Sequence, residues 1–295
     1  MSVSKKIKLD KMVKICTHSG SFHADESLAV YMLRLLPQFQ NSELVRSRNP
    51  QDWEASDIVV DVSGKYDGVK FFDHHQREFD TTFSSAYKTK LSSAGLVYKH
   101  FGKEIISTIL PDKSEAAVDF LYEKVYKEFI EALDANDNGI SNYSAETDAE
   151  KKFNDKNITL PSMVSKLNPS WEIDAKDEDF DAQFEKASKL MGDAFHNLVK
   201  GYGSWMNAKD IVEQAFKERA SVDESQQILV LNQFCPWKEH LYEIEKENNA
   251  QGSIKFVLFK DSSGKWRVST VSVTSTSFEF RQGLKPEWRG LRDDE

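Results

Sequence analysis

The chain has 295 residues, a formal net charge of −9, 39% hydrophobic residues and 12% aromatic residues. This length suits about two domains with buried cores, and the composition excludes a wholly disordered chain, a collagen-like repeat and a disulfide-knotted miniprotein. The acidic balance argues against unspecific coating of nucleic acid but leaves a local basic groove open. No apolar run approaches the roughly 20 residues of a membrane helix, so we expect no membrane association.

The cysteines and the N-terminus indicate in which cellular compartment the protein could be found. Cys16 and Cys235 are the two cysteines and form no CxxC pair, which is typical of a reduced, intracellular protein without a cysteine zinc site. Residues 1–14 are lysine-rich and lack the apolar segment of a secretory signal, so we expect a solvated N-terminal tail. A weak nuclear-import patch at residues 5–8 is the alternative. Cytoplasm, nucleus and mitochondrion all remain candidate locations.

The first 140 residues alternate between strand and helix patterns. Short apolar runs predict strands at residues 12–18, 43–48, 57–62 and 69–73. Apolar residues at helical spacing predict helices at residues 24–36, 92–101 and 114–133. Because short links join these elements, the pattern predicts an α/β fold with a parallel, doubly wound sheet.

The second half begins with a polar, irregular segment at residues 141–160 and continues as helical patterns to residue 218, which predict a helical linker. A break in composition at residues 220–226 indicates a domain boundary. Beyond it the expected elements are a strand at 227–231, a helix from Pro236 and a hairpin of 254–260 with 265–273. We therefore expect three parts: the tail (1–14), a main domain with the linker (15–220) and a second, smaller α/β domain (221–295).

Histidines and aspartates gather where the predicted strands end. Ligands of open parallel sheets bind outside the carboxyl ends of the strands, so these side chains are expected at one edge of the sheet. The end of the 114–133 helix can add a further carboxylate. The residues are His18, His23 and Asp25 after the first strand, Asp61 after the third, Asp73, His74 and His75 after the fourth, and Asp134 and Asp137 after the helix.

Imidazole and carboxylate groups without cysteine suit Mn²⁺, Mg²⁺, Co²⁺ or Zn²⁺, and the excess of carboxylates favours the harder ions. There are more candidate ligands than one ion can use, so we expect two ions about 3.5–4 Å apart. Such a pair would activate water beside a phosphoryl group. Asp61 is the candidate bridging ligand. Taken singly, Asp61 is most simply a turn or helix cap, and His74 and His75 are exposed polar residues. Their conjunction at one edge favours the metal site.

Five segments resemble, in order and spacing, the motifs of the DHH phosphoesterase superfamily: FHADE (22–26), DVSG (61–64), DHH (73–75), SSAGLVYKHFG (92–102) and LDANDNGI (133–140). Together with PWKEHL (236–241) and PEWRGLRDDE (286–295), they are most similar to its melanocyte-proliferating-gene exonuclease family. The resemblance implies a DHH domain, a DHH-associated domain and Mn²⁺- or Mg²⁺-dependent phosphodiester hydrolysis. For this family it implies 3′–5′ exonuclease action on RNA.

The resemblance also implies residue roles. The implied metal ligands are His18, His23, Asp25, Asp61, His74 and Asp137. Asp73 is expected to hold a neighbouring imidazole in its tautomer, and His75 to contact phosphate or act as general acid. Asp137 is preferred to Asp134 as a ligand because Asn138-Gly139 lets the chain turn away. His23 stands where many superfamily members have Asp. The family's glycine-rich motif near the C-terminus is not visible, which indicates a shortened C-terminus.

Substrate binding is expected mainly from the second domain, across a cleft from the metal edge. Arginine and lysine can grip phosphate oxygens, and aromatic rings can stack on a base. For each group the alternative is a surface charge, a core ring or a structural histidine. The candidates are Lys238, Arg281 and Arg289 for phosphate, His240 and Trp288 for a base, and His100 beside the cleft.

The sequence therefore predicts a two-domain, metal-dependent phosphodiesterase, with RNA or a short oligonucleotide as substrate. Mn²⁺ is the preferred cofactor, and Mg²⁺ or Co²⁺ are alternatives. In the predicted mechanism the ions activate water for in-line attack and His75 protonates the leaving oxygen. The alternatives are a hydrolase of a small substrate such as pyrophosphate and a non-catalytic, metal-binding regulator. The sequence does not determine the oligomeric state and leaves a homodimer open.

Overall fold

The computed structural model describes residues 12–141 and 154–291, so the lysine patch expected at residues 5–8 and the last four residues of the 286–295 motif lie outside it. The chain forms two compact units, Met1–Lys200 and Gly201–Glu295. The division falls at 200/201 instead of the expected 220/221, because helix α8 (Ala208–Val222) packs on strand β5 (Ile228–Val230) and helix α9 (Lys238–Glu247). The end of the expected linker is therefore part of the second unit.

The first unit is built on a four-stranded parallel sheet with the order β2-β1-β3-β4. Its strands are β1 (Lys14–Thr17), β2 (Glu43–Arg46), β3 (Ile58–Val60) and β4 (Phe71–Phe72). The parallel sheet is confirmed, and β1 begins one residue inside the expected tail. The predicted strand at 69–73 shrinks to two residues because the Asp67 carboxylate accepts hydrogen bonds from the backbone N–H groups of Val69, Lys70 and Phe71. Those bonds form a turn in place of a strand.

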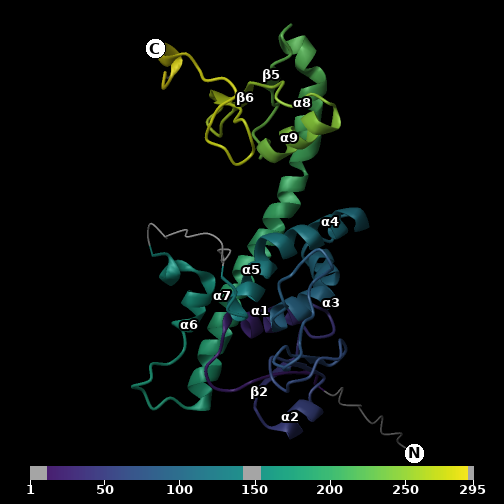
Figure 1. Ribbon diagram of the computed structural model, residues 1–295, viewed down its shortest axis with the longest axis vertical. Helices are drawn as coiled ribbons and strands as arrows, with labels where there is room; N and C mark the ends of the chain where they lie inside the picture. The colour runs from purple at the N-terminus through teal and green to yellow at the C-terminus, as the bar shows by residue number, and fades with distance from the viewer. Residues whose placement is uncertain (1–11, 142–153, 292–295) are drawn as a thin grey trace, which may run out of the picture. The chain divides into compact units, whose positions relative to one another are not determined.

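Helices cover the sheet, and the alternation of side chains along each strand decides which helix meets which face. Cys16 and Val59 share one face with Trp53 of helix α2 (Pro50–Ala55). On the other face, Phe72 packs against Phe101 of helix α3 (Ser93–Ile109) with ring centroids 5.7 Å apart. Helix α1 (Ala24–Arg34) lies beside α3, and both are seen on the side of the sheet away from α2 (Figure 1).

The predicted 114–133 helix is interrupted. Helix α4 (Glu115–Val125) and helix α5 (Glu131–Asp137) are joined by a π-helical turn, Tyr126–Ile130. In this turn Tyr126 stacks on Phe83, with ring centroids 3.7 Å apart. A 3-10 turn (Lys156–Ile158), helix α6 (Leu160–Ser165) and helix α7 (Asp177–Met206) follow. Periodicity alone predicts a continuous helix here, whereas the structure has a π-helical turn where Tyr126 packs on Phe83.

The second unit has a small mixed sheet and its own core. Strand β6 (Phe256–Lys260) pairs in parallel with β5 and antiparallel with β7 (Trp266–Thr270), so the predicted hairpin is confirmed. A 3-10 turn at Pro286–Trp288 follows. Helices α8 and α9 pack on the sheet through residues such as Phe216, Leu241 and Ile244, which are almost fully buried. In neither described part of the chain is a helix both long and apolar enough to cross a membrane.

Candidate metal centre

The strand ends of the first unit bring the expected residues together. His18 directly follows β1, Asp61 directly follows β3, and His74 lies two residues beyond β4. His23 precedes the first residue of α1. Asp61 has a backbone φ of 55°, and Ser63 has a φ of 129°. A non-glycine residue in the left-handed region costs free energy, and such strain often marks a functional turn. Here it turns the chain sharply after β3 and presents the Asp61 carboxylate at the sheet edge.

Asp61 occupies the middle of the cluster. Its Oδ2 lies 3.4 Å from His18 Nε2, and its Oδ1 lies 3.5 Å from His74 Nε2. The Ser93 hydroxyl, in the first turn of α3, donates to Oδ1 at 3.0 Å. Burial would raise the pKa of Asp61, but contact with the two imidazoles outweighs burial and lowers it below its usual value. Asp61 is therefore an anion that faces both histidines.

The ligand atoms form three overlapping groups, and Asp61 belongs to two of them. One group contains His18, His23, Glu26 and Asp61, and another contains Asp25, His74 and Asp137; a third set, Asp61, His74 and His75, joins them. Within each group the ligand atoms lie within 4.8 Å of one another. Carboxylate and imidazole donors at this spacing suit divalent cations of intermediate or hard character. These clusters could therefore hold metal ions, and Asp61 belongs to two of the three.

Unpartnered buried oxygens provide an independent test of this fit. Both carboxylate oxygens of Asp25 and Oε2 of Glu26 are buried without a hydrogen-bond partner in the described parts of the chain. Burial, together with the negative charges of Asp61 and Asp137, raises the pKa of Asp25 well above its usual value. Buried carboxylates normally have donors, so a cation would complete their coordination. The residues present fit a metal centre.

The two central histidines are oriented as ligands. His18 Nδ1 lies 3.2 Å from the Ser19 carbonyl, which can accept its proton and leave Nε2 for the carboxylates. Burial would lower the pKa of both His18 and His74. Contact with Asp61 and Glu26 raises that of His18 to about 10, and contact with Asp137 and Asp61 raises that of His74 to about 10. A bound cation would displace these protons, so metal affinity should decrease as the pH is lowered.

Glu26 belongs to the site although the sequence analysis did not include it. Its Oε1 accepts a hydrogen bond from the His23 backbone N–H at 2.7 Å and lies 3.1 Å from His18 Nε2. By its spacing, Glu26 looks like an ordinary capping residue at the third position of a helix. The available signal was its place beside Asp25 in the FHADE segment that follows the first strand. Helix capping and a ligand role are compatible, because the carboxylate has two oxygens.

His75 and Asp73 form a pair at the rim. His75 Nδ1 lies 2.7 Å from Asp73 Oδ1, and the Gly64 backbone N–H donates to Asp73 Oδ2 at 2.7 Å. Burial would raise the pKa of Asp73, but these hydrogen bonds lower it, and Asp73 in turn raises the pKa of His75. The His75 side chain is 61% exposed. The pair therefore presents an oriented imidazole to solvent.

The structure separates the two aspartates of α5. Asp137 Oδ2 lies 3.1 Å from His74 Nε2, at the metal cluster. Asp134 is fully buried and accepts hydrogen bonds from the backbone N–H and hydroxyl of Ser92 and from the Tyr126 hydroxyl. Burial raises the pKa of Asp134 to about 7, against the opposing effect of Ser92. Asp134 thus holds the start of α3, where Ser93 meets Asp61.

Two cavities adjoin the cluster, and His23, Asp61 and His75 line both of them. The smaller cavity has a volume of about 350 Å³ and includes Arg48, whose Nη2 lies 3.2 Å from His18 Nδ1. The larger cavity has a volume of about 680 Å³ and reaches Asp25, His74 and Asp137. Its remaining polar lining, which the sequence analysis did not anticipate, consists of Asn136, Lys156, Asn157, Thr159, Ser162, Ser165 and Lys166.

Arg281 and His240 have partners inside the second unit. The Arg281 guanidinium forms two 2.7 Å hydrogen bonds with Glu245, which is almost fully buried. His240 is also buried, and its Nε2 lies 2.8 Å from the Trp205 carbonyl. A guanidinium engaged in this way and a buried ring are not available to a substrate. The structure therefore gives both residues a packing role in place of the expected substrate contacts.

The other expected substrate residues are dispersed. His100 Nε2 lies 2.8 Å from the Tyr66 hydroxyl, and the His100 ring packs on Phe72, so its contacts are with the helix–sheet layer. Lys238 begins α9 and is half-buried. Arg289 Nε donates to the Leu284 carbonyl at 2.9 Å. For Lys238, Arg289 and the exposed Trp288, a substrate contact stays a prediction.

The fold and the cluster define an α/β protein with a candidate metal centre at the carboxyl edge of a parallel sheet. A family model described as an uncharacterised protein family (UPF0160), with the label MYG1 exonuclease, matches residues 14–295. The chain belongs to this MYG1 family. No solved structure shows a significant match.

The match between this chain and its relatives covers most of each relative's length. A MYG1 protein of Saccharomyces cerevisiae is 62% identical over 301 residues, which cover 100% of this chain and 89% of the relative. A MYG1 protein of Schizosaccharomyces pombe is 48% identical, over 97% of this chain and 87% of the relative. The human MYG1 exonuclease is 42% identical, over 97% of this chain and 77% of the relative.

Proposed function

We propose that this protein is a metal-dependent phosphodiesterase of the DHH superfamily and that it acts as a 3′–5′ exonuclease on RNA. The observation that carries the proposal is the convergence of carboxylates and imidazoles on Asp61, with both oxygens of buried Asp25 unpartnered in the described parts of the chain. The exonuclease names of the human and rat relatives support nuclease action. The superfamily, the RNA preference and the polarity rest on the motif resemblance.

The proposed ligands come from two sets, one of His18, His23, Glu26 and Asp61 and one of Asp25, His74 and Asp137, and Asp61 also lies 3.5 Å from His74 of the second set. Two divalent ions, with Mn²⁺ preferred and Mg²⁺ or Co²⁺ as alternatives, would supply an activated water and neutralise charge on the phosphoryl group. Asp61 would be shared by both ions. Ser93 holds the orientation of this carboxylate through the 3.0 Å hydrogen bond to Oδ1.

His75 is the proposed proton donor to the leaving oxygen. Its Nδ1 is held by Asp73, so the ring is oriented with Nε2 away from Asp73. A raised pKa keeps a larger fraction of the imidazole protonated near neutral pH, which suits a general acid. The same ring lines both cavities, so a phosphodiester that spans them would pass beside it.

Asp61→Asn tests the proposal directly. Asparagine tolerates a left-handed backbone, so the fold should persist at φ 55°. Loss of the shared charge should lower the hydrolysis of a short labelled RNA by more than about a hundredfold, since even residues that only support metal ligands contribute roughly 10–100-fold. Turnover with Mn²⁺ and bound metal measured by elemental analysis are the readouts.

Asp119→Asn is the matched control, because this exposed aspartate on α4 pairs with Lys103 at the surface and lines neither cavity at the cluster. It should leave turnover unchanged. Near-normal RNA hydrolysis by folded, metal-treated Asp61→Asn would contradict the proposed site. Cleavage of pyrophosphate but not RNA by the unmodified chain would favour the small-substrate alternative. Metal binding without hydrolysis of either would favour a regulator.

A further inference from the structure

The larger cavity has two chemically different parts. The metal part is acidic and contains Asp25, Asp61 and Asp137. The other part comes from the 3-10 turn and α6, and carries Lys156, Lys166 and the hydroxyl groups of Thr159, Ser162 and Ser165. We call residues 156–168 the α6 wall. Within residues 12–141 and 154–291 neither lysine pairs with a carboxylate, and Lys166 Nζ donates to a neutral backbone carbonyl, so both positive charges remain available to an anion.

The α6 wall is built into the first unit. Lys166 Nζ donates to the Asn157 carbonyl at 3.1 Å and joins α6 to the preceding turn. Asn168 clamps the Phe22 backbone: its Oδ1 accepts from the Phe22 N–H at 2.9 Å, and its Nδ2 donates to the Phe22 carbonyl at 2.9 Å. Phe22 directly precedes His23. The two hydrogen bonds therefore anchor the wall to the loop that carries a proposed ligand.

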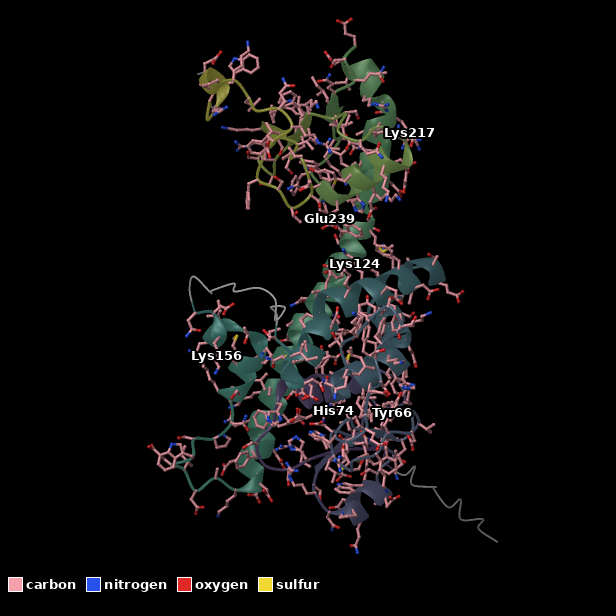
Figure 2. The ribbon with its side chains drawn as sticks, in the orientation of Figure 1. Tyr66, His74, Lys124, Lys156, Lys217 and Glu239 are labelled. Carbon is pink, nitrogen blue, oxygen red and sulfur yellow. The ribbon has the colours of Figure 1, made fainter. Side chains whose placement is uncertain are left out.

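Phe22 gives this anchor a rigid base. It is almost fully buried, and its ring meets Phe184 of α7 edge-on with centroids 5.7 Å apart. Such aromatic pairs add to the free energy of burial. Figure 2 labels Lys156 at the α6 side of the first unit and His74 towards the sheet, and both residues line the same cavity. The wall therefore keeps a defined place relative to the metal cluster.

The lining indicates how a ligand would be recognised. Ammonium, hydroxyl and amide groups suit phosphate and ribose oxygens. No Phe, Tyr or Trp occurs in the described lining of this cavity, and its three histidines lie at the metal cluster, so the α6 wall itself offers a base no aromatic ring. A volume of about 680 Å³ lies within the range of pockets for whole organic ligands and is far more than one inorganic phosphate needs. These features favour a chain of phosphates and sugars.

We propose that the α6 wall binds the backbone of single-stranded nucleic acid next to the scissile phosphate, with Lys156 and Lys166 on successive phosphates. This inference rests on the proposed function and specifies its substrate as an oligonucleotide of several phosphates, recognised with little regard to base sequence. It also places substrate binding within the first unit itself. The acidic centre takes the scissile phosphate with its cations, and the lysines hold the phosphates beyond it.

The test combines the double variant Lys156→Gln, Lys166→Gln with substrates of different length. Bis(p-nitrophenyl) phosphate offers one phosphodiester and nothing for the wall, so its kcat/KM should change less than twofold. An RNA octamer should show a KM raised by about tenfold or more. The octamer's binding constant, measured by fluorescence anisotropy, should also depend less on salt. The slope of its logarithm against the logarithm of salt concentration should become shallower by roughly 1.4, since each single-strand phosphate contact contributes about 0.7.

The control is the double variant Lys186→Gln, Lys189→Gln, which removes the same charge from exposed lysines of α7 outside the cavity. It should leave the KM, the slope and the small-ester rate unchanged. An unchanged octamer KM and slope in the wall variant, with normal hydrolysis by the unmodified chain, would overturn this inference alone. Octamer binding that depends on the wall lysines without hydrolysis of either substrate would overturn the proposed function but support the wall.

Discussion

Asp61 combines a left-handed backbone with a buried, ionised carboxylate between two imidazoles. Each property is costly alone, because strain and desolvation both oppose folding. They are tolerated together since His18 and His74 offset the charge and Ser93 donates to Oδ1. This arrangement explains how one aspartate at a strand end can contact both histidines of the cluster as an anion.

Asp134 leads to a prediction about pH. Its pKa is raised from about 3.8 to about 7, so unfolding releases its proton at any pH between those values. The stability that protonated Asp134 contributes is therefore complete below about pH 4 and is lost as the pH rises through 7. Asp134→Asn keeps an acceptor for Ser92 and has no titration. The free energy of unfolding of the unmodified chain, relative to this variant, should fall by roughly 4 kcal/mol at most from pH 4 to pH 8.

Urea unfolding at a series of pH values measures this difference. Other carboxylates titrate in the same window, and taking the difference between the two proteins cancels them. Exposed Asp119→Asn should show no such pH-dependent difference. A difference that is flat, or that grows in favour of the unmodified chain at high pH, would mean that Asp134 is ionised in the folded protein.

At the scale of elements, the start of α3 supports the metal edge. Ser92 caps the helix and also donates to Asp134, while Ser93 in the first turn donates to Asp61. Gly95 allows this approach, since a Cβ at this position would overlap the Asp134 carboxylate. The helix end, the buried aspartate and the central ligand therefore form one connected unit.

Gly95→Ala tests this packing, with Gly201→Ala in α7 as the matched change. Alanine favours a helix over glycine by up to about 1 kcal/mol, and at Gly201 a Cβ meets nothing within 4 Å, so stability should rise slightly. At Gly95 the overlap with a buried, hydrogen-bonded group should reverse the sign and cost about 1–3 kcal/mol. Denaturant midpoints measure both. A stabilised Gly95→Ala protein would show that Asp134 can move at little cost.

At the scale of the whole molecule, the chain consists of two units with separate cores. The residues of the candidate metal centre all belong to the first unit. A ligand that binds only the folded state stabilises the part that holds it, by about 2.7 kcal/mol at a hundredfold excess over Kd. The two units should therefore respond differently to metal.

Hydrogen exchange measured by mass spectrometry tests this difference. Mn²⁺ should slow exchange in peptides that contain β1, α1 and β3, and should leave peptides from β5 to β7 unchanged. A chelator should reverse the effect, because the folded centre loses its cations. Equal slowing in both units would show that they unfold as a single cooperative body, and no slowing in either would contradict the metal centre.

By itself, the sequence determined the alternation of strands and helices, the parallel sheet and the place of His18, Asp61 and His74 after its strands. These features follow from local patterns, because apolar periodicity and strand ends are properties of short segments. The tertiary structure alone decided that Glu245 engages Arg281 and that the α6 wall lines the larger cavity. Each depends on contacts such as that between Asn168 and Phe22, 146 positions apart, which no local pattern encodes.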